Sequence, residues 1–206
     1  MKIKDVYSKY FQPPMLVTHQ LRVASVGYLI LNSLGIKDEE VVKALLFHDL
    51  GNIVRIKFGL FADEDYKELG VSFYKSKQEE VIQKYGNVDH DVTVKMLKEI
   101  GLNQRIVELV ELIKWENIAS AIDSDDIILK IINYSDMRVG PMGILSAIER
   151  IDEVNKRKQN WVEYTTIRKL VVELENQIFS KSKITPESID NDIVNKTIGI
   201  LESWDL

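Results

Sequence analysis

Apolar residues recur along most of this 206-residue chain at the three- and four-residue spacing that places them on one face of an α-helix. Convincing alternation of apolar and polar residues, which would indicate strands, is absent. The first helix should begin near Pro14 and end at Gly35, because proline suits a first helical turn and glycine a helix end. Its apolar stripe consists of Leu16, His19, Val23, Val26 and Ile30.

Residues that favour helix ends divide the rest of the chain into further helical segments. A second helix is expected from Asp38, which suits an N-cap, to Gly51. The remaining helices are expected near residues 71–85, 89–100, 103–121, 124–140, 143–158, 161–180 and 186–204. The chain is therefore predicted to be all-α, a helical bundle with a C-terminal helical extension.

Composition narrows the classes of function. Lysine and arginine number 27 against 32 aspartates and glutamates, so the net charge is -5 and duplex nucleic acid is not an expected partner. The start of the chain lacks the apolar core of a signal peptide, and no apolar run approaches the roughly 18 to 20 residues needed to span a membrane. We expect a cytoplasmic protein with no membrane partner.

Cysteine is absent, which excludes disulfides and thiolate metal sites. A bound metal would therefore have to be held by imidazole and carboxylate groups, and the chain has three histidines.

The segment "ALLFHDLGNI" places His48 and Asp49 on the inward side of the second helix. His48 continues a spacing of four and three residues from Val41 and Leu45, and Asp49 does the same from the neighbouring apolar row. In the helix that is expected to end at Gly140, Asp136 again follows inward-facing isoleucines at helical spacing. Together with the histidine of the first helix, the inward polar residues are His19, His48, Asp49 and Asp136.

Each inward polar residue taken alone could be a hydrogen-bonded core residue, and a helical scaffold in which histidines pair with aspartates remains an alternative. Four such groups near helix ends favour a shared cation, because each would be costly to bury unpaired. Two imidazoles and two carboxylates leave octahedral positions for water and substrate. This donor set suits Mn, Fe, Co, Ni or Mg better than a closed zinc site.

The segments "VTHQLRVASVGYLI", "ALLFHDLGNI" and "IINYSDMRVG" resemble, in this order, the H...HD...D signature of HD-domain metal-dependent phosphohydrolases. His19 lies 29 residues before His48, and Asp136 lies 87 residues after Asp49. The resemblance implies an HD-domain-like helical bundle in which these four residues bind the metal, with Asp49 bridging if a second ion is present. The resemblance covers about residues 14–145, the metal-binding core, and the later helices carry no further motif. We expect one HD-type domain over residues 1–206, with C-terminal helices at about 146–206.

The chain also departs from the family pattern. Many members follow the doublet with Gly-Lys, whereas this chain has Gly51 and Asn52. His90 resembles the additional histidine of members with larger metal sites, but no histidine follows it. His90 is therefore open to two interpretations, an exposed residue of a first helical turn or a site residue.

Hydrolysis at such a site needs cations for the phosphate and a proton acceptor for the attacking water. We expect Arg22 and Arg138 to bind the phosphate, because they follow His19 and Asp136 closely in sequence. Arg55 and Lys57 are further candidates, or solvated loop charges. The acceptor is expected to be Asp49 or His90.

The function that these residues predict is hydrolysis of a phosphate ester or anhydride in a small phosphorylated metabolite, with a nucleotide favoured by the resemblance. The aromatic residues after the doublet could stack on a base or pack a cover helix; they are Phe58, Phe61, Tyr66, Phe73 and Tyr74. A symmetrical dinucleoside tetraphosphate hydrolase is one alternative, and a non-catalytic HD module that senses a nucleotide or partner is another. The amphipathic C-terminal helices would allow a homodimer.

Overall fold

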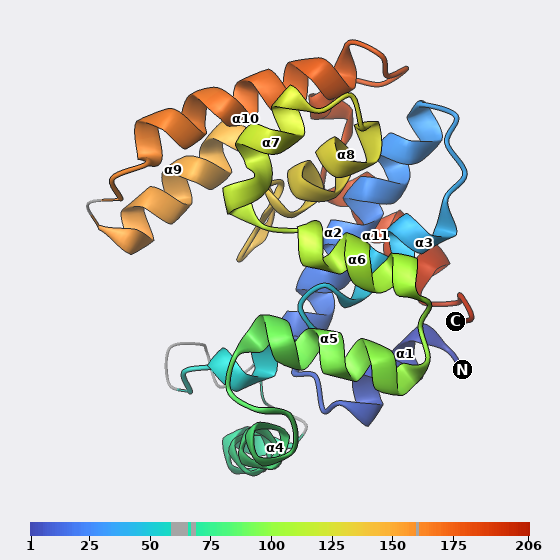
Figure 1. Ribbon diagram of the computed structural model, residues 1–206, viewed down its shortest axis with the longest axis vertical. Coiled ribbons are helices and arrows are strands. Elements are labelled where there is room, and N and C mark those ends of the chain that lie inside the picture. Colours follow the sequence, from blue (N-terminus) through green and yellow to red (C-terminus); the bar gives the residue numbers. More distant parts are fainter. Residues whose placement is uncertain (59–65, 67–68, 160) are drawn as a thin grey trace.

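The computed structural model describes residues 1–58, 66, 69–159 and 161–206, and their regular structure is almost entirely helical (Figure 1). The α-helices are α1 (Ile3–Lys9), α2 (Pro14–Ser33), α3 (Glu39–Phe47), α4 (Gly70–Tyr85), α5 (Asp89–Ile100), α6 (Gln104–Leu112), α7 (Ile118–Asp123), α8 (Ile127–Asp136), α9 (Ala147–Lys158), α10 (Tyr164–Phe179) and α11 (Asn191–Leu201). The 3-10 helices are η1 (Leu50–Arg55), η3 (Trp115–Asn117) and η4 (Pro186–Ser188), and β1 (Val139–Gly140) pairs with β2 (Gly143–Ile144). The predicted all-α fold is confirmed.

The helix α2 is central, and it packs against α3, α8 and α11. Its middle turns are apolar all round, as expected of a helix covered by neighbours on several sides. Val23, Val26 and Ile30 have no exposed surface. This burial places the first histidine of the chain, near the start of α2, at the edge of the main core.

Gly27 allows α2 to approach both α3 and α8. A Cβ atom at Gly27 would lie 2.2 Å from Cδ1 of Leu45 on α3 and 3.1 Å from Oγ of Ser135 on α8. Since Leu45 precedes the His-Asp doublet by one helical turn and Ser135 directly precedes Asp136, this contact brings three helices together beside the inward polar residues.

A second close contact holds the segment that follows the doublet. The amide of Gly51 in η1 donates a hydrogen bond of 2.9 Å to Oγ1 of Thr93 on α5. A Cβ atom at Gly51 would lie 1.9 Å from the carbonyl oxygen of Asp89. Glycine is therefore required for η1 to pack directly on the first turns of α5.

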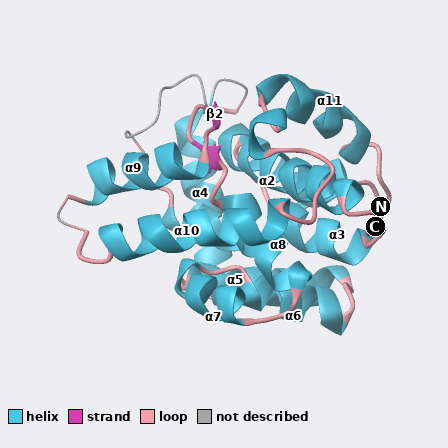
Figure 2. Cartoon of the chain, turned by 90° about the horizontal axis from the view of Figure 1, so that it is seen from above, coloured by secondary structure: helices cyan, strands magenta, loops and turns pink. Residues whose placement is uncertain are grey.

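The helices α9 and α10 lie side by side at one end of the molecule, while α4 and α5 lie toward the other end (Figure 1). The chain termini lie close together on one side, as the view from above also shows (Figure 2). The amide of Leu206 donates a hydrogen bond of 3.0 Å to the carbonyl oxygen of Met1. None of the described helices is long and apolar enough to cross a membrane.

Two helix boundaries differ from the prediction in ways that affect the site. The helix α3 ends at Phe47, before the doublet, and η1 begins at Leu50. The segment predicted as one helix over residues 103–121 is interrupted at Ile113, whose ψ of 84° leaves the helical region, and η3 follows. The interruption at Ile113 places Trp115 outside a regular α-helix and next to α8.

Other differences lie outside the metal-binding motif. The short helix α1 was not predicted, although it buries Ile3, Val6 and Tyr7. A short hairpin occupies residues 139–144, so α9 starts at Ala147 rather than near residue 143. Ser146 caps α9 and forms a capping box with Glu149.

Candidate active site

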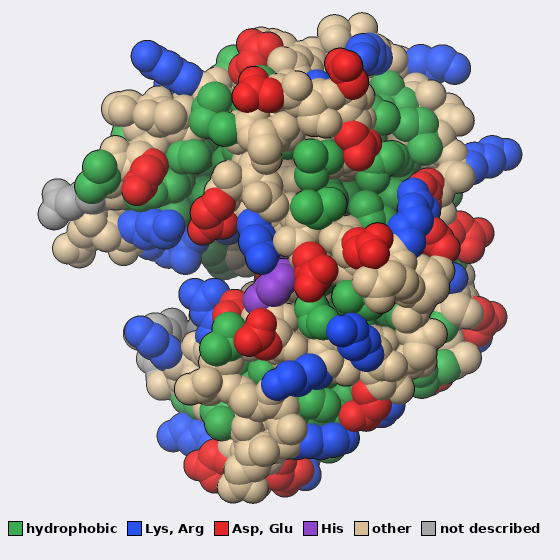
Figure 3. Space-filling view, viewed as in Figure 1, with side chains coloured by type: hydrophobic (Ala, Val, Ile, Leu, Met, Phe, Trp, Pro, Cys, Tyr) green, Lys and Arg blue, Asp and Glu red, His purple; other side chains and the backbone are tan. Residues whose placement is uncertain are grey.

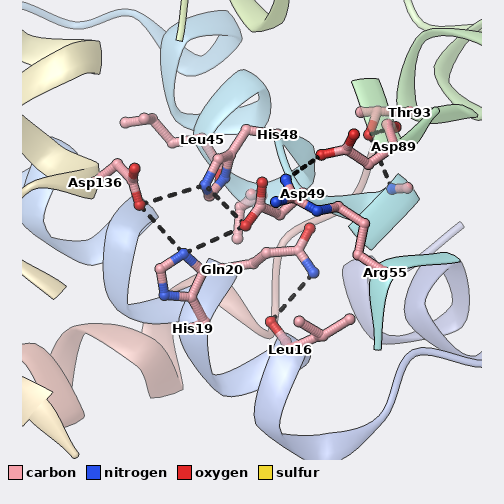
Figure 4. Close-up of polar contacts among 12 residues, drawn as sticks. Leu16, His19, Gln20, Leu45, His48, Asp49, Arg55, Asp89, Thr93 and Asp136 are labelled. Atoms are coloured by element: carbon pink, nitrogen blue, oxygen red, sulfur yellow. Dashed lines mark hydrogen bonds and ion pairs between the residues drawn. The ribbon is translucent and has the colours of Figure 1, made fainter. Parts of the chain in front are cut away.

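The structure brings the four inward polar side chains together (Figure 4). His19 comes from α2, His48 and Asp49 from the junction of α3 and η1, and Asp136 from the last position of α8. We call these four residues the His-Asp cluster. The ligand atoms of His19, His48 and Asp49 all lie within 4.8 Å of one another, as expected of groups that share a metal ion.

Each imidazole Nε2 atom of the His-Asp cluster faces both carboxylates. His19 Nε2 lies 3.2 Å from Oδ1 of Asp136 and 3.5 Å from Oδ2 of Asp49. The corresponding distances from His48 Nε2 are 3.8 Å and 3.7 Å. Two nitrogen atoms and two oxygen atoms therefore point toward one small volume.

The backbone orients His48 for coordination. Its Nδ1 lies 2.8 Å from the carbonyl oxygen of Leu45, and an N–H at that position would donate to it. The Nε2 atom is buried and has no hydrogen-bond partner among the described residues. A nitrogen held in this way presents its lone pair to the His-Asp cluster, so the residues present fit a divalent cation.

The electrostatics of the protein groups agree with this fit. Burial lowers the pKa of His48, but Asp49 and Asp136 oppose it and raise that pKa to about 9. Burial raises the pKa of Asp136, but the facing imidazoles of His19 and His48 oppose it and hold that pKa well below its usual range. Positive charge is thus favoured in the His-Asp cluster, either as a proton on His48 or as a bound cation.

Trp115 holds one of the carboxylates from outside the His-Asp cluster. Its indole Nε1 donates a hydrogen bond of 3.0 Å to Oδ2 of Asp136, which leaves Oδ1 facing the two histidines. Nearby, the amide of Lys114 donates to Oδ1 of Asn133 on α8 over 3.1 Å. Sequence reasoning missed Trp115, because helical periodicity gives no sign of the interruption that places it here.

The His-Asp cluster lies in a cleft of about 730 Å³ that is lined by residues of η1, α5, η3 and α9 together with those of the cluster. Figure 3 shows the notch on this face, with lysine and arginine side chains on both rims. The cationic residues that line the cleft are Arg55, Lys57, Lys114, Arg150, Arg157 and Lys158. Only Arg55 and Lys57 were singled out from the sequence.

Arg138 is a correction to the sequence-based expectation. It does not line the cleft, and only 3% of its surface is exposed. Its guanidinium donates hydrogen bonds to the hydroxyl of Tyr134 over 2.9 Å and to the carbonyl oxygens of Pro186 and Ile189. Because these groups occupy the guanidinium away from the cleft, Arg138 serves to hold the C-terminal segment.

Of the other residues singled out from the sequence, one lies outside the cleft and two line it. Arg22 is absent from the cleft lining, and burial lowers its pKa. His90 does line the cleft, and its Nε2 is buried without a partner in the described part of the chain. Arg55 lines the cleft but its guanidinium binds Asp89 at 2.8 Å.

The aromatic residues after the doublet pack on one another. Ring centroids are 5.6 Å apart for Phe58 and Tyr66, 5.6 Å for Tyr66 and Tyr74, and 5.3 Å for Phe73 and Tyr74. None of these four rings lines the cleft, which favours the packing interpretation over base stacking. Phe61 lies outside the described residues.

Comparison with known proteins agrees with the geometry. The sequence model of the HD domain matches residues 16–138, more than half of the chain, and this span contains the whole His-Asp cluster. No curated protein and no solved structure gives a significant match. The chain belongs to the HD-domain family of metal-dependent phosphohydrolases.

Proposed function

We propose that the chain hydrolyses a phosphate ester or anhydride bond of a small phosphorylated metabolite, with a nucleotide as the preferred class. The observation that carries this proposal is the position of the His-Asp cluster within a cleft that six cationic side chains also line. A volume of about 730 Å³ is within the range of small-molecule sites.

The metal would be held by His19, His48, Asp49 and Asp136, whose nitrogen and oxygen donors suit Mn, Fe, Co, Ni or Mg. When bound, a divalent ion polarises a phosphoryl oxygen and lowers the pKa of its water. Trp115 supports the arrangement by keeping Oδ2 of Asp136 occupied.

The protein groups then bind the phosphate and accept the proton. Lys57 and Lys114 line the cleft and have no carboxylate partner among the described residues, so they are free to bind phosphate oxygens. Attack by the water oxygen forms a new P–O bond, and the bond from phosphorus to the leaving oxygen breaks. The water proton passes to Asp49 or to the unpartnered Nε2 of His90.

The cleft also bears on domain organisation. Residues of α9, beyond the span matched by the HD-domain family, line the same cleft as the His-Asp cluster. We therefore propose that the core and the C-terminal helices act as a single domain of residues 1–206.

Hydrolysis should be measured with p-nitrophenyl phosphate and nucleoside mono-, di- and triphosphates in the presence of Mn²⁺, Co²⁺, Ni²⁺ or Mg²⁺. We expect turnover by the native chain and a loss of about 100-fold or more in Asp49→Asn and His48→Ala, because removal of a metal ligand disables the activated water. Asp49→Asn is the more informative variant, since His48 is also part of the packed core.

Metal binding should be followed separately by thermal unfolding. A ligand at about 100 times its Kd stabilises the folded state by about 2.7 kcal/mol, which corresponds to about 5 to 10 °C for a domain of this size. If metal raises the Tm of the native chain but no substrate is cleaved, the chain is a sensing module and the hydrolase proposal fails. If metal has no effect on Tm or activity, the His-Asp cluster is a structural ion-pair network.

A further inference from the structure

The helix α9 presents a continuous face to the cleft. Arg150, Val154, Arg157 and Lys158 all line it, at spacings of four, seven and eight residues that fall on one side of a helix. These residues follow the span matched by the HD-domain family. We call this face the α9 wall.

The α9 wall carries positive charge that the neighbouring carboxylates do not balance. Glu153 forms ion pairs with both Arg150 and Arg157, so two guanidinium groups share one carboxylate. Lys158 has no carboxylate within ion-pair distance among the described residues. Its ammonium lies 4.5 Å from the centroid of the Trp161 ring.

The cationic side chains of the α9 wall differ from one another in solvent exposure. The side chain of Arg157 is 58% exposed and Lys158 is exposed, whereas that of Arg150 is 11% exposed and its guanidinium carbon lies 5.7 Å from the Trp115 ring centroid. Arg150 is therefore fixed in the wall, while Arg157 and Lys158 can turn toward an incoming anion.

A single phosphoryl group does not account for these charges. That group would bind beside the His-Asp cluster, where Lys57 and Lys114 line the cleft and a bound cation would lie close by. Positive charges on a separate wall of the same cleft can bind further anionic oxygens of the same substrate molecule. Arginine and lysine are the residues that bind phosphate groups best in proteins.

We propose that the α9 wall binds a phosphate group other than the one that is cleaved, so that the substrate carries a chain of two or more phosphates. Arg157 and Lys158 are the specificity-determining residues, and Arg150 supports them. The identity of the cleaved group rests on the proposed function, but anion binding by the wall does not require turnover.

The binding test uses metal-depleted protein and isothermal titration with orthophosphate, pyrophosphate and tripolyphosphate. We expect tripolyphosphate to bind at least about tenfold more tightly than orthophosphate, because each further charge-assisted contact adds affinity. The double variant Arg157→Gln/Lys158→Gln should lose most of this preference. The single variant Lys158→Gln, which leaves the Arg157 to Glu153 pair intact, should lose part of it.

The matched control is Lys156→Gln/Lys169→Gln, which removes the same net charge from exposed positions of α9 and α10 that do not line the cleft. It should keep the preference for tripolyphosphate, and thermal unfolding should show that both double variants fold. Equal preference in the native chain and Arg157→Gln/Lys158→Gln would overturn the proposal, as would a loss of the same size in the control.

A kinetic test separates this proposal from the proposed function. With Mn²⁺, Arg157→Gln/Lys158→Gln should lower kcat/KM for ATP about tenfold more than it lowers kcat/KM for p-nitrophenyl phosphate. An equal decrease for both substrates would contradict a role in binding a second phosphate. If the native chain cleaves neither compound but still prefers tripolyphosphate in the binding test, the hydrolase proposal fails and the anion site stands.

Discussion

Trp115 Nε1 and Asp136 Oδ2 form a hydrogen bond of 3.0 Å between the 3-10 helix η3 and the end of α8. This bond leaves the other oxygen of Asp136 facing His19 and His48. Trp115 is thus a positioning residue for the His-Asp cluster rather than a member of it.

Replacement of Trp115 by phenylalanine should weaken metal binding by about 10-fold, because residues that orient metal ligands typically contribute 10- to 100-fold in affinity. Phenylalanine keeps most of the ring packing but lacks the N–H donor. Calorimetric titration with Mn²⁺ measures the effect. Trp161→Phe is the control, since Trp161 packs against Trp115 with ring centroids 5.7 Å apart but forms no bond to the His-Asp cluster. Equal affinities in both variants would contradict the prediction.

Arg138 should contribute to stability and not to catalysis. In Arg138→Gln the hydroxyl of Tyr134 and the carbonyl oxygens of Pro186 and Ile189 lose donors, which should lower the free energy of unfolding by about 3 kcal/mol. Urea unfolding measures this, and kcat/KM of the folded fraction should stay within about twofold of the native value.

The control for Arg138 is Arg105→Gln. Arg105 forms ion pairs with Asp38 and Glu40 at the surface, and such pairs contribute about 1 kcal/mol or less. A loss of activity in Arg138→Gln without loss of stability would restore Arg138 as a phosphate ligand.

Gly27→Ala should separate the three helices that carry the His-Asp cluster. The added methyl would meet Leu45 Cδ1 at 2.2 Å, and overpacking of this kind costs about 1 to 3 kcal/mol. We expect a lower Tm and weaker Mn²⁺ binding in the same variant. Gly199→Ala, where a Cβ atom meets nothing within 4 Å, should change neither property by much; intact metal affinity in Gly27→Ala would show that the cluster tolerates the shift.

The ion pairs of Glu99, outside the His-Asp cluster, should make the stability of the protein depend on pH. Hydrogen bonds from Lys84 and Tyr85 lower its pKa from 4.5 to about 2, and Lys9 adds an ion pair at 3.2 Å. Because the folded-state pKa is the lower one, the stabilisation is present above pH 4.5 and is lost as the pH falls toward 2. The difference in Tm between the native chain and Glu99→Gln should therefore shrink over this interval. A difference that is constant with pH would show that the ion pairs contribute nothing.

Local sequence determined most helices and the identity of the cluster residues. The apolar spacing around His19 and Asp136 indicated that each faces inward, because both lie within helices and the direction of a side chain then depends on helical geometry. Asp49 was assigned in the same way, but it lies just beyond the end of α3. Asp38, which the sequence indicates as an N-cap, caps α3 in the structure.

Tertiary contacts decided the surroundings of the cluster. The interruption at Ile113 gives Trp115 its contact with Asp136, and periodicity alone predicted an unbroken helix there. Arg138 is two residues from Asp136 in sequence, yet carbonyl oxygens of residues 186 and 189 turn its guanidinium away from the cleft. Arg157 belongs to an amphipathic helix whose pattern shows an exposed face but not what lies opposite it. A periodic pattern reports which side of a helix is buried, whereas the partner of a side chain depends on residues far away in the chain.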